Sequence, residues 1–147
     1  MTIFDRCRLG VAVTLLAQAL ASLPAGAAGA LAVGVAPGGA QEGFAFGMNS
    51  NKSSAEAARQ DAVKACGTAK ESNDVARSRC KSVGTFTNQC AAMSMDPKDG
   101  TPGVGWAIAA NSADANKAAL AKCEATAGAG RAGTCTVSAT RCDGTAK

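Results

Sequence analysis

Large apolar residues alternate with small or polar residues in several short stretches of the chain, and this period of two, together with β-branched residues at 81–87, predicts six β-strands. Because successive side chains of a strand point to opposite faces, Leu31 and Val33 would share one face of the first strand, and Phe44 and Phe46 one face of the second. Pro and Gly residues at 37–39 predict a hairpin turn between these two. The six expected strands cover residues 30–35, 43–48, 81–87, 90–95, 104–108 and 135–140.

Two alanine-rich stretches, residues 53–66 and 111–123, have the spacing of helices, and each ends in a cysteine. Ser53 with Glu56 fits a capping box, and Asn111 with Asp114 is a looser version of the same motif. Alanines recur along one face of the first helix, which would let that helix lie close to a sheet.

The same order of features occurs twice: strand, turn, strand, capped helix, cysteine, loop, cysteine, strand and cysteine. This order predicts an internal duplication of a β-β-α-β unit, with repeats at about residues 29–90 and 91–147. Two such units can join their strands, so we expect an α+β fold with one antiparallel sheet and two helices on one face.

The N-terminal segment is typical of a signal peptide. Arg6 and Arg8 precede an apolar run at 9–23, and the small residues around Ala27 suit a signal peptidase. We expect cleavage after Ala27, with Ala30 as the alternative site. The run is shorter than the ~20 apolar residues of a membrane span. Residues 1–27 are therefore predicted to be the signal peptide, and residues 28–147 a single secreted or periplasmic domain without a transmembrane span.

Cysteine usage supports an oxidising compartment. Of seven cysteines, Cys7 would leave with the signal peptide, and an even number in an exported domain predicts three disulfides. The repeat favours equivalent bonds in both units, although a swapped pair such as Cys66–Cys135 would obey the same symmetry. The favoured pairs are Cys66–Cys80 and Cys123–Cys135, with Cys90–Cys142 joining the two halves.

Little of the sequence points to catalysis. The chain has no histidine, which is the commonest general base, and its cysteines are expected to be paired. The lack of histidine and of any Cys-x-x-Cys pair also disfavours zinc. We therefore predict no catalytic, cofactor-binding or metal-binding residues. A hydrolase would have to use carboxylates, for which the candidates are Glu56, Asp61, Asp96 and Asp99.

Three short strings resemble functional motifs without their structural context. Residues 128–133 match a dinucleotide fingerprint, but they follow a helix and precede a strand, so a flexible loop is predicted. Ser78 and Lys81 match Ser-x-x-Lys but lack its companion motifs. Asp96 and Asp99 lack the spaced ligands of a calcium loop, and a turn explains them.

Positive charge is concentrated near the end of the first helix, and it provides the candidate binding loop. The competing interpretation is a solvated basic loop, because no aromatic residue is interleaved to stack on bases or sugars. The residues concerned are Lys64, Lys70, Arg77, Arg79 and Lys81.

Taken together, the two Ala-rich helices ending in Cys66 and Cys123, the strand with Phe44 and Phe46, and the strand with Trp106 resemble an exported bacterial family. It is the family of domains of unknown function numbered four-one-eight-nine. The resemblance extends over essentially the whole predicted mature chain. It implies a secreted or envelope protein of bacteria, some of them pathogens, without an established activity.

The leading functional prediction is an exported, non-catalytic protein that binds an unknown protein or an anionic envelope polymer. A host component is expected as partner if the source is a pathogen, and no specific nucleic acid is expected. The alternative is an inhibitor or modulator of another exported enzyme, acting through the loop at residues 67–79. A hydrolase is the third interpretation.

Overall fold

The computed structural model describes residues 27–147, so the predicted signal peptide lies almost entirely outside the described residues. The first half of this region contains three strands and two helices. They are β1 (Ala28–Val35), β2 (Phe44–Lys52), α1 (Ala55–Gly67), the one-turn helix α2 (Asp74–Arg77) and β3 (Lys81–Phe86).

The second half repeats this order, with a short 3-10 helix in place of α2. Its elements are β4 (Cys90–Met95), β5 (Val104–Ala109), α3 (Ser112–Ala127), η1 (Ala129–Arg131) and β6 (Thr136–Cys142). All six predicted strands and both predicted long helices are present, although α3 continues four residues past its expected end at Cys123.

The strands divide into two antiparallel three-stranded sheets, ordered β2-β1-β3 and β5-β4-β6. The register shifts at the same place in both: between Leu31 and Ala32 where β1 pairs with β3, and between Met93 and Ser94 where β4 pairs with β6. The two halves therefore share element order, strand order and the position of a bulge.

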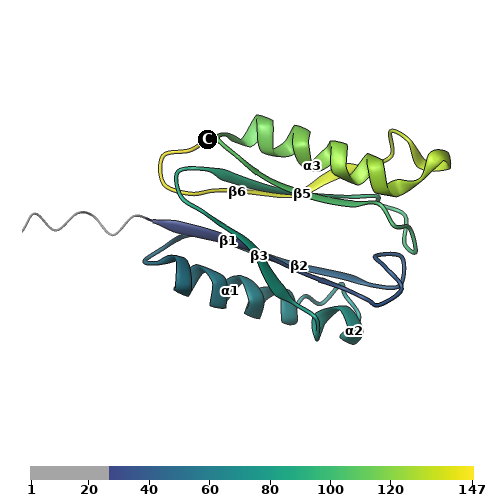
Figure 1. Cartoon of the computed structure of the whole chain (residues 1–147), viewed down its shortest axis with the longest axis horizontal. Coiled ribbons are helices and arrows are strands. Elements are labelled where there is room, and N and C mark those ends of the chain that lie inside the picture. Colours follow the sequence, from purple (N-terminus) through teal and green to yellow (C-terminus); the bar gives the residue numbers. More distant parts are fainter. Residues whose placement is uncertain (1–26) are drawn as a thin grey trace, which may run out of the picture.

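The arrangement of these sheets differs from the expected single sheet with both helices on one face. The sheets lie face to face, with α1 on the outside of one and α3 on the outside of the other (Figure 1). Leu31, Val33, Phe44 and Met93 form the core between the sheets. The α+β class and the antiparallel pairing are confirmed, but the molecule has four layers.

Small residues cover the outer faces of the sheets, where the helices pack. Ala58 and Ala62 of α1 and Ala115 and Ala119 of α3 are fully buried there. Gly47 of β2 and Gly105 of β5 occupy corresponding positions under the two helices. A side chain at Gly47 would lie 2.3 Å from the Ala62 carbonyl oxygen, so these glycines permit the close approach of helix to sheet.

All three favoured disulfides are formed: Cys66–Cys80, Cys123–Cys135 and Cys90–Cys142. The Cys90–Cys142 bond was expected to join the two halves, but it connects different segments. Cys90 begins β4 and Cys142 ends β6, and the two are directly opposite in one sheet. This bond therefore links neighbouring strands of the second half and does not join the halves.

The helix caps agree with the sequence in α3 and differ in α1. Asn111 caps α3, and its side-chain oxygen accepts the Asp114 backbone N–H at 2.9 Å. The N-cap of α1 is Ser54, not Ser53, and it accepts the Ala57 N–H. The Glu56 side chain turns to Arg59 and Gln60.

A buried carboxylate connects the C-terminal segment to the first half. Asp143 is fully buried. Its two oxygens accept backbone N–H groups, from Asn51 at the end of β2 (2.8 Å) and from Asn88 in the β3–β4 connection (3.4 Å). Both asparagines have positive φ, and their side-chain oxygens accept the N–H groups of Gly144 and Thr145. We call this contact of Asp143 with Asn51 and Asn88 the Asp143 clasp.

Candidate functional site

The candidate binding loop does not present all of its basic residues to solvent. The Arg77 guanidinium donates to the carbonyl oxygens of Ala69 (3.2 Å) and Ser72 (2.6 Å) and pairs with Asp74. Arg77 therefore stabilises the loop at 67–79 by internal contacts. The loop is not irregular throughout, because it contains the short helix α2.

The other basic residues of this set separate into different places. Lys64 is on the exposed side of α1, beside a shallow hollow that it shares with Glu56 and Arg59. Lys70 is exposed on the loop. Only Arg79 and Lys81, which flank the start of β3, line a larger depression together.

That depression lies between the two sheets and meets a second one at Val35 and Trp106. The first has a volume of about 630 Å³ and is lined by Arg79, Lys81 and Val83 among others; the second, of about 610 Å³, extends along β5 to Lys122 and Thr126 of α3. We call the two together the Trp106 groove, whose floor is mainly apolar. Its lining includes Val35, Arg79, Lys81, Val83, Trp106 and Lys122.

Trp106 is held in a fixed position within the groove. Its ring stacks on Phe44 with centroids 6.3 Å apart and an angle of 22° between the planes. Its backbone carbonyl oxygen accepts a hydrogen bond from Lys122 Nζ at 2.9 Å. The indole is only partly buried, so it offers an ordered aromatic surface to a ligand.

Three cations line the groove together with Trp106. Arg79, Lys81 and Lys122 are exposed, and within residues 27–147 none of them forms an ion pair. An unpaired guanidinium or ammonium beside an apolar floor attracts a carboxylate or phosphate. The groove thus combines the positive charge expected from the sequence with an aromatic residue, Trp106, that is distant from Arg79 and Lys81 along the chain.

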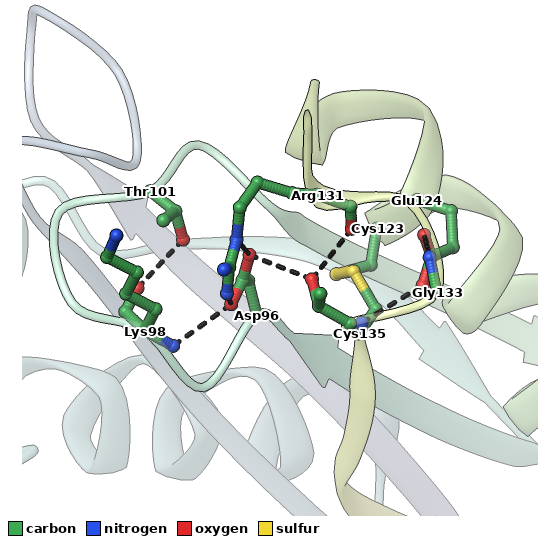
Figure 2. A network of polar contacts seen from close by, with 9 residues as sticks. Asp96, Lys98, Thr101, Cys123, Glu124, Arg131, Gly133 and Cys135 are labelled. Atoms are coloured by element: carbon green, nitrogen blue, oxygen red, sulfur yellow. Dashed lines mark hydrogen bonds and ion pairs between the residues drawn. A yellow bond between two sulfur atoms is a disulfide. The ribbon is translucent and has the colours of Figure 1, made fainter. Parts of the chain in front are cut away.

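A separate polar network holds the loops at the far end of β4 (Figure 2). The Asp96 side chain is fully buried and accepts from Arg131 Nε at 2.7 Å and Arg131 Nη2 at 2.5 Å. The Thr134 hydroxyl (3.0 Å) and the Lys98 backbone N–H (3.0 Å) complete its partners. These hydrogen bonds hold the pKa of Asp96 well below its usual range, although desolvation acts in the opposite direction. The hydrogen bond from Arg131 has the largest effect.

The stretch at 128–133, expected to be a flexible loop, is held on both sides. Arg131 binds Asp96, and the Glu124 carboxylate of α3 accepts the backbone N–H groups of Gly133 (2.6 Å) and Cys135 (2.9 Å). Figure 2 shows these contacts on either side of the Cys123–Cys135 disulfide. The network braces the connection between α3 and β6.

The four carboxylates considered for hydrolysis are not brought to one site. Glu56 and Asp61 lie on the exposed side of α1, where hydrogen bonds from Arg59 and Lys52, respectively, lower their pKa values. Asp96 and Asp99 line a hollow of about 310 Å³ at the β4–β5 turn. Three of the four are engaged with cations, and an ionised, paired carboxylate is poorly suited to proton transfer at neutral pH.

Sequence reasoning missed the Trp106 groove and the Asp96–Arg131 pair. Each depends on residues more than twenty positions apart that meet only when the sheets and loops pack. The positive charge of Arg79 and Lys81 was the one signal in the sequence, and no local pattern joined these residues to Trp106.

Comparison with known proteins adds one match. A family model described as "Domain of unknown function (DUF4189)" matches residues 28–142. No curated protein and no solved structure matches the chain. Among the described residues, no helix has both the length and the apolar character needed to cross a bilayer.

Proposed function

This chain belongs to the DUF4189 family, and we propose that it is an exported, non-catalytic module that binds an anionic partner in the Trp106 groove. The observation that carries this proposal is that three cations, Arg79, Lys81 and Lys122, line the groove with Trp106, and within residues 27–147 none of them forms an ion pair. Aromatic surface supplies contact area and the cations supply the preference for negative charge.

Export is supported by two features of different kinds. The sequence predicts a signal peptide at residues 1–27, and the domain contains three disulfides. Disulfides persist in oxidising compartments such as the periplasm and the extracellular space and are rare in the cytosol. A partner would then be an envelope or extracellular component.

The absence of catalysis is part of the proposal and has its own support. The chain contains no histidine, its six domain cysteines are all disulfide-bonded, and Glu56, Asp61 and Asp96 pair with basic side chains. None of the groups lining the Trp106 groove is a carboxylate.

The chain offers a direct test, because Trp106 is its only tryptophan and it has no tyrosine. Emission excited in the indole therefore reports on the groove alone. The oxidised domain would be titrated with polyglutamate, a polyuronate and a single-stranded oligonucleotide, with neutral dextran as control. We expect at least one polyanion to change the emission saturably at low salt and more weakly at high salt, since salt screens exposed charges.

The matched variants are Lys81→Gln, which removes a cation of the groove, and Lys117→Gln, which removes an exposed cation of α3 outside it. Binding should weaken in the first and not in the second. If no polyanion alters Trp106 emission, or if both variants bind like the wild type, the proposed function is wrong.

One observation favours the inhibitor or modulator function as a second candidate. The loop at 67–79 is enclosed by the Cys66–Cys80 disulfide and braced by Arg77, and it presents Val75 with 49% of its surface exposed. A rigid loop with an exposed apolar side chain suits insertion into an enzyme cleft. Val75→Asp should abolish capture of an enzyme partner and leave polyanion binding at Trp106 unchanged. Equal capture by wild type and variant would count against it.

A further inference from the structure

The Trp106 groove is bordered by β5 and β3, each of which is an edge strand of its sheet. An exposed edge could in principle pair with an extended peptide through backbone hydrogen bonds. The state of these two edges therefore bears on what kind of ligand the groove accepts.

The edge of β5 is already occupied by side chains of α3. The Thr126 hydroxyl lies 3.0 Å from the backbone nitrogen and 2.9 Å from the carbonyl oxygen of Val104. Lys122 Nζ donates to the carbonyl oxygen of Trp106 at 2.9 Å. A peptide strand added along Val104 and Trp106 would have to displace all of these contacts.

The edge of β3 is irregular at the position that faces the groove. Leu31 pairs with Gly84 and Ala32 with Ser82, which leaves Val83 as an extra residue in a β-bulge. Lys81 stands beside it on the same edge. Bulges and edge lysines are the features by which sheets resist the addition of a further strand.

With backbone pairing disfavoured on both sides, recognition falls to the side chains. The ring face of an indole packs well against the apolar face of a sugar ring, and Arg or Lys donors bind a carboxylate carried on that ring. Arg79 and Lys81, at the start of β3, and Lys122 of α3 line the groove together with Trp106, so a ligand stacked on the indole would meet cations from both halves of the protein.

A long, uniformly charged polymer fits less well. The hollow next to the groove, which shares Ala40 and Gln41 with it, is lined by the carboxylates of Glu42, Glu71 and Asp99 against a single lysine, Lys98. These carboxylates would repel a polyanion that continued past the groove. Single-stranded nucleic acid is further disfavoured because its binding sites use several aromatic side chains on successive bases, whereas Trp106 is the sole aromatic lining the groove.

Building on the proposed function, we infer that the ligand of the Trp106 groove is a short acidic oligosaccharide. One sugar ring stacks on Trp106, and its carboxylates and those of neighbouring sugars pair with Arg79, Lys81 and Lys122. The apolar floor at Val35 and Val83 contacts the faces of the adjoining rings.

The test compares a short oligogalacturonate with its methyl ester, which has the same rings and no charge. We expect the acid to change Trp106 emission saturably and the ester to bind at least about tenfold more weakly, since hydrogen bonds to charged groups are the stronger ones. Arg79→Gln and Lys81→Gln should each weaken binding of the acid by about tenfold. Lys117→Gln serves as the control, and Trp106→Phe, followed by calorimetry, should lose most of the binding.

The outcomes separate this inference from the proposed function. Binding of polyglutamate or of an oligonucleotide that depends on Arg79 and Lys81, without binding of the oligogalacturonate, would overturn the saccharide and leave an anion-binding module. Equal binding of acid and ester would overturn the role of the carboxylates. If no anionic probe perturbs Trp106, both statements fail.

Discussion

At the scale of single residues, Asp96 shows how a buried charge is accommodated at the end of a strand. Its carboxylate has four donors around it, two of them from the Arg131 guanidinium. Such a pair is costly to break on one side, because the remaining charge keeps its desolvation without its partner. Asp96 and Arg131 should therefore be more important for stability than the exposed pairs on α1.

The lowered pKa of Asp96 predicts a specific pH dependence. Its folded-state pKa lies below the unfolded value of about 3.9, so ionised Asp96 stabilises the fold above pH ~4, and this contribution is lost as the pH falls from about 4 towards the folded-state pKa. Asp96→Asn should lower the free energy of unfolding at neutral pH and flatten its decline in acid. Urea unfolding at a series of pH values would measure both.

Asp99→Asn, at an exposed position of the same turn, is the control for that experiment and should follow the wild type. If Asp96→Asn and wild type lost stability in parallel below pH 4, the ion pair would not be the origin of the acid sensitivity.

The chain shows which residue roles can be predicted from sequence. Asn111 as a cap and the three cysteine pairs were predictable, because caps are local and the repeat ordered the cysteines. Arg131, in contrast, lies in a glycine-rich stretch that reads as a loop, and only tertiary packing brings it to Asp96. Trp106 and Lys81 likewise belong to different sheets, so no local pattern joins them.

At the scale of elements, the contact between each helix and its sheet depends on one glycine. A side chain at Gly105 would lie 2.3 Å from the Ala119 carbonyl oxygen and 2.4 Å from the Cys123 nitrogen, nearly the same distances as at Gly47. Because the obstacle is helix backbone, it cannot be relieved by a change of rotamer. The whole helix would have to move away from the strand.

We therefore predict that Gly47→Ala and Gly105→Ala each lower the free energy of unfolding by about 1–3 kcal/mol, the usual cost of overpacking. Gly130→Ala is the matched control, since nothing lies within 4 Å of its added methyl group. Denaturant unfolding monitored by circular dichroism would measure all three. Equal stability of the three variants would show that the helices can shift without cost.

The disulfides should differ in their contributions because they close chain segments of different length. Cys90–Cys142 spans 52 residues, compared with 14 for Cys66–Cys80 and 12 for Cys123–Cys135. Loop-closure entropy gives about 4 kcal/mol for the long segment and about 3 kcal/mol for each short one. Each cysteine pair would be replaced by serines and the unfolding of the variants by guanidinium measured. We expect the variant that lacks Cys90–Cys142 to lose the most stability. The reverse order would indicate that structure in the unfolded chain dominates.

At the scale of the whole molecule, the sequence pattern predicts the strands but not the arrangement of the layers. The alternation identified which residues share a face, but a face of large side chains can be covered by a helix or by a second sheet. The deciding signal is that β1 has no polar face: Leu31 and Val33 line one side, and Ala30 and Ala32 the other, and all four are buried. Two covered faces require a layer on each, which a single sheet with helices on one side cannot provide.

The Asp143 clasp should matter for the association of the two halves. Asp143→Ala would leave the backbone N–H groups of Asn51 and Asn88 without their acceptor, and we expect a loss of about 1–3 kcal/mol in the free energy of unfolding. Hydrogen exchange should show the extra opening at Asn51 and Asn88 first. Asp99→Ala, at an exposed position, should have neither effect, and identical exchange in all three proteins would exclude a role for the clasp.

The placement of the disulfides has a consequence for the covalent chain. Cys66–Cys80 lies wholly before residue 87 and the other two bonds wholly after residue 89, so nothing but the peptide backbone at 87–89 connects the two halves covalently. A single cut there would turn the protein into a two-chain complex joined by the buried faces of its sheets. Denaturant without reductant would then release two pieces, each with its own disulfides intact, and the halves could be expressed apart and tested for reassembly as a split protein.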